Sequence, residues 1–153
     1  MPRPVLRDLV STTGDLAALP TTVVRLLELL RDQTCAAEHL AQVLDRDGAM
    51  TANVLKLCNS AFYGLRGTVS TTRQALVMLG NRAVATLAFA TGMVPVMRRH
   101  LVGYGMDRER FWEHSLHWAM SAGLASEHLG LGDRVCEAFT AGLVHDVGML
   151  VLD

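Results

Sequence analysis

Histidine and aspartate stand side by side in an otherwise apolar run, AGLVHDVGML, as His145 and Asp146. An imidazole nitrogen and a carboxylate oxygen form a ligand mixture that suits Fe, Mn or Zn better than calcium. Neighbouring residues of a helix point about 100° apart, so the pair can address one site from two directions. The pair therefore indicates either a metal site that does chemistry or a polar contact kept for structure.

Two further histidines precede this pair, in FWEHSLHWAM. His114 and His117 are three positions apart and so lie near one face of a helix, with Phe111 and Trp118 beside them. His114 would complete a set of two histidines and one carboxylate that could seat a metal with open positions. The alternative is that the same three side chains hydrogen-bond one another between two helices. For His117, the aromatic neighbours favour packing.

The elements that must position these residues all show helical spacing. Apolar residues recur at intervals of three and four, and no stretch alternates as a half-buried strand would. About eight helices are expected, the last two over roughly 107–128 and from 133 to the end. The expected interior residues are Leu26, Leu30, Leu55, Leu76 and Phe139. The pattern predicts a compact all-α fold.

Several helix ends carry recognisable signals. The expected N-caps are Thr21 or Thr22, Asp47 and Ser70. Gly80 is expected to end one helix and Asn81 to begin the next, which Pro95 should kink or end. In CNSAFYG, Asn59 and Ser60 are expected to end a helix and bond its freed carbonyls, with Phe62 and Tyr63 folded over it. Ligand contact is the alternative for this motif.

Composition argues against several classes of protein. Half of the residues are hydrophobic and 19% are charged, which fits a folded domain rather than a disordered chain. Lys and Arg number 14 and Asp and Glu 15, so no net charge attracts nucleic acid or an anionic membrane. No signal peptide is visible, and the longest uncharged run falls short of the ~20 residues that a membrane span needs. Neither nucleic acid nor a membrane is expected as a partner.

Two weaker signals complete this description. Cys35, Cys58 and Cys136 are odd in number and far apart, so no disulfide framework is predicted and a reducing cytoplasm is favoured. A basic spot is expected to be a solvated helix end, with phosphate or RNA binding as the alternative. It comprises Arg98, Arg99, His100, Arg108 and Arg110.

A family resemblance rests on longer stretches. HSLHWAMSAGLASEHLG followed by EAFTAGLVHDVGML resembles part of the HD-domain metal-dependent phosphohydrolases. From LAALPTTVVRLLELL through CNSAFYG and ALVMLG to AGLVHDVGML, over residues 16–152, the chain resembles more specifically the HDOD (HD-related output domain) family of bacterial signalling proteins. The motif residues that we regard as structural are Asn59, Ser60, Tyr63, Gly64, Gly142 and Gly148.

The resemblance implies a single helical domain over 1–153, with an N-terminal part over 1–100 and an HD-like helix pair over 107–153 that is incomplete at its carboxyl end. It also implies a cytoplasmic, non-catalytic output or regulatory module without a cofactor, which acts through contacts with signalling proteins or fused signalling domains. Because the apolar residues of the last predicted helix surround it almost completely, an exposed patch and self-association are expected.

By the same resemblance, His114, His145 and Asp146 match the metal ligands of HD enzymes. We interpret them as a vestigial set, since Met149 stands where active enzymes often have lysine and the last ligand would fall beyond Asp153. The alternative is a metal-dependent phosphohydrolase or phosphodiesterase, in which Fe, Mn or Zn activates a water for attack on a phosphoester.

Overall fold

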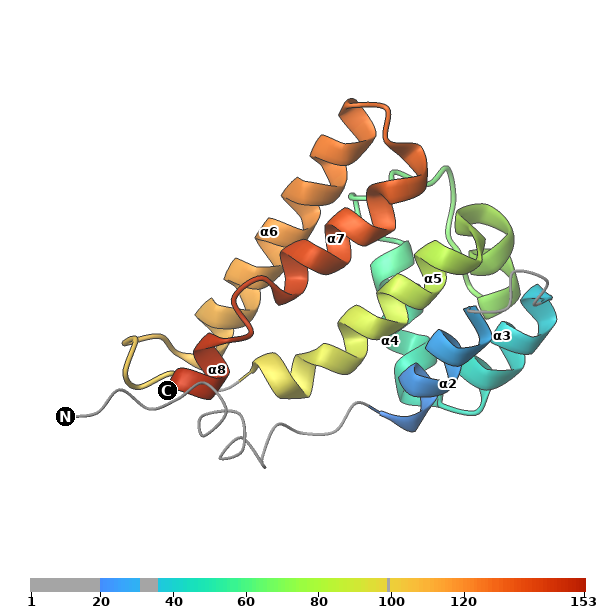
Figure 1. Ribbon diagram of the computed structural model, residues 1–153. Helices are drawn as coiled ribbons and strands as arrows, with labels where there is room; N and C mark the ends of the chain where they lie inside the picture. Colours follow the sequence, from blue (N-terminus) through green and yellow to red (C-terminus); the bar gives the residue numbers. More distant parts are fainter. Residues whose placement is uncertain (1–19, 31–35, 99) are drawn as a thin grey trace. The chain divides into compact units, whose positions relative to one another are not determined.

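Helices make up the regular structure of residues 20–30, 36–98 and 100–153, the part of the chain that the computed structural model describes (Figure 1). In chain order they are α2 (Thr21–Leu30), α3 (Ala37–Asp45), α4 (Gly48–Cys58), α5 (Thr72–Met97), α6 (Arg108–His128), the 3-10 helix η1 (Gly132–Arg134), α7 (Val135–Val144) and α8 (Met149–Leu152). Leu101 and Met106 form an isolated β-bridge. No strand occurs within residues 20–30, 36–98 and 100–153. The predicted all-α class is confirmed.

The described residues form two compact units, 20–93 and 94–153, and α5 contributes to both. In the first unit each helix contributes apolar side chains to one buried cluster, which removes them from water and stabilises the fold. Side chains at most 4% exposed include Val23, Leu26, Leu40, Leu44, Val54, Cys58, Val69, Leu76, Val84 and Leu87. The prediction of a single domain over 1–153 stays a prediction.

The expected interior is confirmed in most of its described members. Leu26, Leu76 and Phe139 are buried, and Leu55 is partly buried against the cluster of the first unit. The side chain of Leu30 lies outside the described part of the structure. The buried face of α2 is narrow: Val23 and Leu26 are buried, whereas the flanking Val24 and Leu27 are 42% and 40% exposed.

The structure confirms one of the three predicted N-caps and contradicts the other two. The Asp47 carboxylate accepts a hydrogen bond from the Met50 amide at 3.0 Å, as expected of an N-cap. The threonine cap expected for α2 is wrong. Thr22 lies inside the first turn, where the Pro20 carbonyl accepts from the Val23 amide, and its hydroxyl donates to Asp47 instead.

The cap expected at Ser70 is also wrong. The hydroxyl of Thr71 accepts from the Gln74 amide at 3.2 Å, so the cap lies one residue later. The Gln74 side chain explains the shift, because its carbonyl oxygen accepts from both the amide and the hydroxyl of Ser70. Ser70 is thereby bound outside the helix while Thr71 caps it.

Gly80 interrupts α5 as predicted, with φ 82° and ψ 164°. Such a backbone conformation strains residues that carry a Cβ atom, so glycine permits the bend between the two parts of the helix. The helix ends at Met97, two residues after Pro95, which agrees with the expectation that proline limits it.

The single helix predicted from residue 133 to the end is wrong. η1 leads into α7, which ends at Val144, and residues 145–148 form turns before the short helix α8. The amides of Val147 and Met149 donate to the carbonyls of Val144 and Asp146, bonds that span three residues and tighten the chain. The apolar residues of this segment therefore do not surround one continuous helix.

Two helical stretches, Thr72–Met97 and Val135–Leu152, have the length and apolar composition that could cross a membrane. This is weak evidence for a span, because core helices of soluble proteins share both properties. Gly80 interrupts the first stretch and the turns at 145–148 interrupt the second. The expectation that no membrane is involved stays a prediction.

Candidate metal site

The helices α6 and α7 pack along each other and position the HD pair (Figure 1). Phe111 and Ala119 of α6 and Phe139 and Leu143 of α7 are buried. Gly142 makes the close approach possible: a Cβ atom there would lie 2.7 Å from the Trp118 carbonyl oxygen. This tight contact occurs on the last turn of α7, directly before the HD pair.

His114, His145 and Asp146 converge as the sequence suggests. Their potential ligand atoms all lie within 4.8 Å of one another. The Asp146 Oδ2 atom lies 3.1 Å from His114 Nε2 and 2.9 Å from His145 Nε2, so one carboxylate oxygen contacts both imidazoles. Because α7 ends at Val144, the turn rather than a continuous helix sets the direction of the pair.

The backbone fixes the orientation of His145. Its Nδ1 atom lies 2.7 Å from the Gly142 carbonyl oxygen, and since a carbonyl only accepts, Nδ1 must carry the proton that is donated. In a neutral ring, Nε2 would then carry the lone pair, and this atom lies 2.9 Å from Asp146 Oδ2. A cation held by both atoms would make so short a contact favourable.

The side chains of the three residues are partly exposed to solvent. The side chains of His114, His145 and Asp146 are 41%, 33% and 35% exposed, so solvent screens the charges. The Trp118 ring forms one wall, with its centroid 5.6 Å from that of His145 and 6.4 Å from that of His114. The sequence places Trp118 beside His114 but does not reveal that it faces both histidines.

Three observations indicate that His114, His145 and Asp146 could hold a divalent metal ion. Two nitrogens and one carboxylate oxygen are a suitable donor set for Fe, Mn or Zn. The contacts of 3.1 and 2.9 Å match the separation of adjacent ligands around an ion with bonds near 2 Å. The bond from His145 to Gly142 leaves Nε2 facing the site, as in metal centres where a carbonyl orients the ligand.

The other predicted site residues lie elsewhere. His117 does not belong to this cluster and is exposed, so the packing expected for it is wrong. Arg98, His100 and Arg110 of the basic spot are exposed, whereas Arg99 and the Arg108 side chain lie outside the described part of the structure. Gly148 has an ordinary helical φ of −59°, and no atom lies within 4 Å of the position that a Cβ atom would take, so no steric demand for glycine exists there.

The CNSAFYG motif ends α4 and holds the next loop. The Asn59 amide group donates to the carbonyls of Leu55 and Val69 and accepts from the Val69 amide, each at 2.8 Å. Ser60 accepts a backbone bond from Tyr63 at 3.2 Å, and the Phe62 and Tyr63 rings meet edge to face. Gly64 follows with φ 53°. These bonds support the structural interpretation of the motif.

Comparisons with known proteins agree with this architecture. The family model of the HDOD domain matches residues 16–153. An HDOD domain protein of unknown function from Geobacter sulfurreducens is 30% identical with a TM-score of 0.76, over 96% of this chain and 48% of that one. The resemblance predicted from the sequence is confirmed.

Two further relatives are more distant. A proposed metal-dependent phosphohydrolase from Shewanella amazonensis SB2B is 23% identical with a TM-score of 0.71, over 94% of this chain and 53% of that one. A protein of unknown function from Treponema pallidum (strain Nichols) is 22% identical over 140 residues, which are 90% of this chain and 26% of that protein. The chain spans about half, or less, of the length of these relatives.

Proposed function

Because the chain belongs to the HDOD domain family, we propose that it is a regulatory module of bacterial signalling that acts by binding another protein. The observation that carries the proposal is an apolar groove along α6 and α7, of about 440 Å³. Contiguous exposed apolar surface on a folded domain is typical of sites that bind proteins.

Small and apolar side chains make up most of the groove lining. They include Ala122, Ala125, Ala138, Ala141, Leu129 and Leu131. Alanines allow another helix to approach closely, and the leucines, 70% and 46% exposed, would gain most from being covered. Arg134 and Glu137 also line the groove and offer one charge of each sign to polar groups at the edge of a ligand. We therefore propose an amphipathic helix of a signalling partner as its occupant.

Site-specific crosslinking tests this proposal. A photoreactive amino acid at position 129, in the full-length protein in its own cell, should capture one defined partner, and the same probe at the exposed position 77 of α5 should not. An Ala125→Arg change should abolish capture by filling the groove. Capture of the chain itself would show self-association instead, and equal capture from both positions would contradict the proposal.

The convergence of His114, His145 and Asp146 favours a second candidate, a metal-dependent phosphohydrolase. These residues would hold the ion, which would supply Lewis-acid activation of water and of a phosphoester oxygen. The chain itself contributes the orientation of His145 through Gly142 and a wall of Trp118. We place this candidate second because the described residues bring three protein ligands together, whereas the resemblance implies one further ligand in active HD enzymes.

Elemental analysis combined with hydrolysis of bis(p-nitrophenyl) phosphate separates the two candidates. The protein is first incubated with Mn, Fe or Zn, and His117→Ala serves as the control for the loss of an exposed histidine. If the protein is a regulatory module, the parent protein and Asp146→Asn should hydrolyse the phosphodiester at the same background rate. Turnover that persists in His117→Ala and disappears in both His114→Ala and Asp146→Asn would establish the enzyme.

A further inference from the structure

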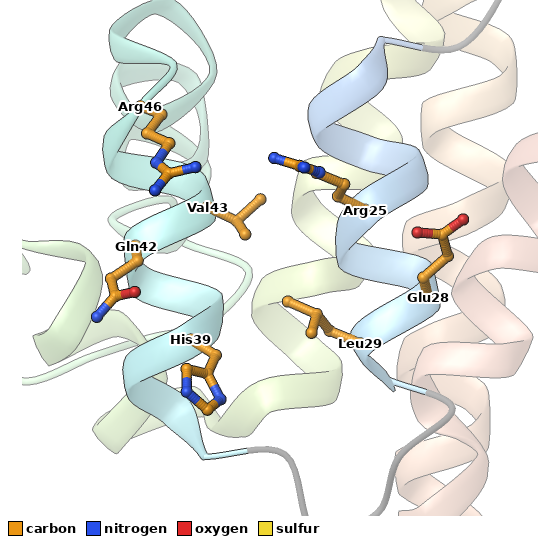
Figure 2. A pocket seen from close by; sticks show the side chains of 7 residues that line it. All are labelled: Arg25, Glu28, Leu29, His39, Gln42, Val43 and Arg46. Carbon is orange, nitrogen blue, oxygen red and sulfur yellow. The ribbon is translucent and has the colours of Figure 1, made fainter.

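A second cleft lies between α2 and α3, within the unit of residues 20–93. Its volume is about 530 Å³, within the range of ~300–1,000 Å³ that is common for small-molecule sites. Both helices contribute charged and apolar side chains to it (Figure 2). Neither the metal cluster nor the apolar groove includes any of these residues, so the cleft is a separate candidate site.

Two arginines occupy one end of the cleft. Figure 2 shows the guanidinium group of Arg25, from α2, directed across the gap toward that of Arg46, which directly follows α3. Among the described residues no carboxylate forms an ion pair with either group, and Glu28 of α2 points away from the pair. Two cations that face the same gap repel each other, and an anion between them would turn this repulsion into attraction.

Guanidinium groups recognise phosphate oxygens particularly well. Each offers several N–H donors in a planar fork, so two of them can bind different oxygens of one phosphate. The Asp45 and Asp47 carboxylates, which neighbour Arg46 in sequence, accept hydrogen bonds from Thr72 and Thr22 instead. The end of the cleft therefore has the character of an anion site.

The rest of the cleft is suited to a flat, partly apolar group. Val43 and Leu29 project into its middle from opposite helices, and both are partly buried (Figure 2). His39 lies at the end away from the arginines. Aliphatic side chains on two sides can enclose a planar ring, and an imidazole can stack on it or hydrogen-bond to its edge.

We propose that this cleft binds a phosphate monoester that carries a planar ring, a ligand of nucleotide size. The phosphate would lie between Arg25 and Arg46, with the ring between Val43 and Leu29. Because the cleft is open and its arginines are exposed, the affinity should be modest and should fall as the salt concentration rises.

Titration of the full-length protein with adenosine 5′-monophosphate, followed by calorimetry and by the arginine Nε–Hε signals in NMR spectra, tests the proposal. The nucleotide should bind at least about tenfold more tightly than adenosine or inorganic phosphate, since each of those fills only one part of the cleft. Arg25→Gln and Arg46→Gln should each weaken binding about tenfold. Arg82→Gln, which removes an exposed arginine of α5 outside the cleft, should change it less than about twofold.

Three results would overturn the proposal. The first is the absence of saturable binding up to about 10 mM nucleotide. The second is an equal loss in Arg82→Gln and Arg25→Gln, which would indicate diffuse attraction rather than a site. The third is a phosphotyrosine peptide that binds far more tightly than the nucleotide, which would assign the cleft to a protein ligand. Unchanged thermal unfolding of each variant establishes that the effects are not caused by loss of the fold.

Discussion

The residues over 20–93 and those over 94–153 use their apolar side chains in different ways. In the first unit every helix contributes to one buried cluster, and such residues as Leu44, Val54 and Cys58 are fully buried. This unit also leaves four large apolar residues exposed, namely Val24, Leu27, Val77 and Met78. In the second unit Phe111 and Leu143 are buried, while a larger set of apolar residues stays exposed. This set includes Val102, Trp118, Leu124, Leu129, Leu131 and Leu152, each at least 46% exposed.

This difference between the two units indicates which residues stabilise the fold and which are available for binding. An interior that is complete within its own helices stabilises the fold, whereas apolar residues left at the surface are available to a partner. The second unit also carries the polar cluster of His114, His145 and Asp146 beside the exposed Trp118. We therefore expect core substitutions in the first unit to act on stability and surface substitutions in the second to act on binding.

Leu76→Ala should give the largest change in stability. Leu76 is 4% exposed, so truncation removes buried methyl groups and leaves a cavity, which should lower the free energy of unfolding by about 2–5 kcal/mol. The neighbouring Val77 is 80% exposed, so Val77→Ala should change the free energy of unfolding by less than about 0.5 kcal/mol. Urea unfolding curves measure both, and similar values for the two variants would contradict the description of this core.

The buried thiol of Cys58 should make stability depend on pH in the alkaline range. Burial raises the pKa of Cys58 from 9.0 to about 11, because the thiolate is disfavoured away from water. The unfolded chain then loses this proton first, so the stabilisation is complete below pH 9.0 and is lost as the pH rises toward about 11. The loss should reach about 2–3 kcal/mol, at 1.36 kcal/mol per pKa unit.

Variants of the cysteines isolate this contribution. Cys58→Ala should flatten the decrease in the free energy of unfolding between pH 8 and about 11, whereas Cys136→Ala, at a half-buried position, should keep it. What matters is the slope with pH rather than the absolute stability, which Cys58→Ala lowers for packing reasons. An unchanged slope in Cys58→Ala would assign the alkaline decrease to other groups.

Gly142→Ala should separate α6 from α7. The new methyl group would lie 2.7–2.9 Å from backbone atoms of Trp118 and Ala119, which cannot rotate away, and we expect a loss of about 1–3 kcal/mol. Gly148→Ala is the matched control, because its φ is −59° and nothing lies near its methyl position. Thermal unfolding measures the stability of both variants. An equal loss of stability in the two would show that α6 and α7 do not need a glycine at position 142.

Sequence patterns anticipated the parts of the structure that depend on local chemistry. Helical spacing, the cap at Asp47 and the break at Gly80 follow from short-range rules. The convergence of His145 and Asp146 with His114 was also predicted, from their positions on two helices. The cap near Ser70 was missed by one residue, because adjacent hydroxyls are equivalent until Gln74 binds one of them. The turn at 145–148 was missed because its apolar residues keep a helical period across it.

Features that depend on two distant segments were not visible in the sequence. Arg25 and Arg46 each fit the solvated face of a helix, and only the packing of α2 and α3 brings them to one cleft. Likewise, Leu129 and Leu131 fit an ordinary helix end, although α6 and α7 place them in one apolar groove. Helical periodicity predicts which face of a helix is apolar, but it does not predict what covers that face.

The affinity of the crosslinked partner for the purified protein tests the central claim most directly. Leu129→Asp places a charge in the apolar groove at a site that is 70% exposed, so it should weaken binding at least about tenfold without unfolding the protein. Val77→Asp, at a site that is 80% exposed in the first unit, should leave the affinity unchanged. Equal affinities for Leu129→Asp and the parent protein would contradict the assignment of this groove as the binding surface.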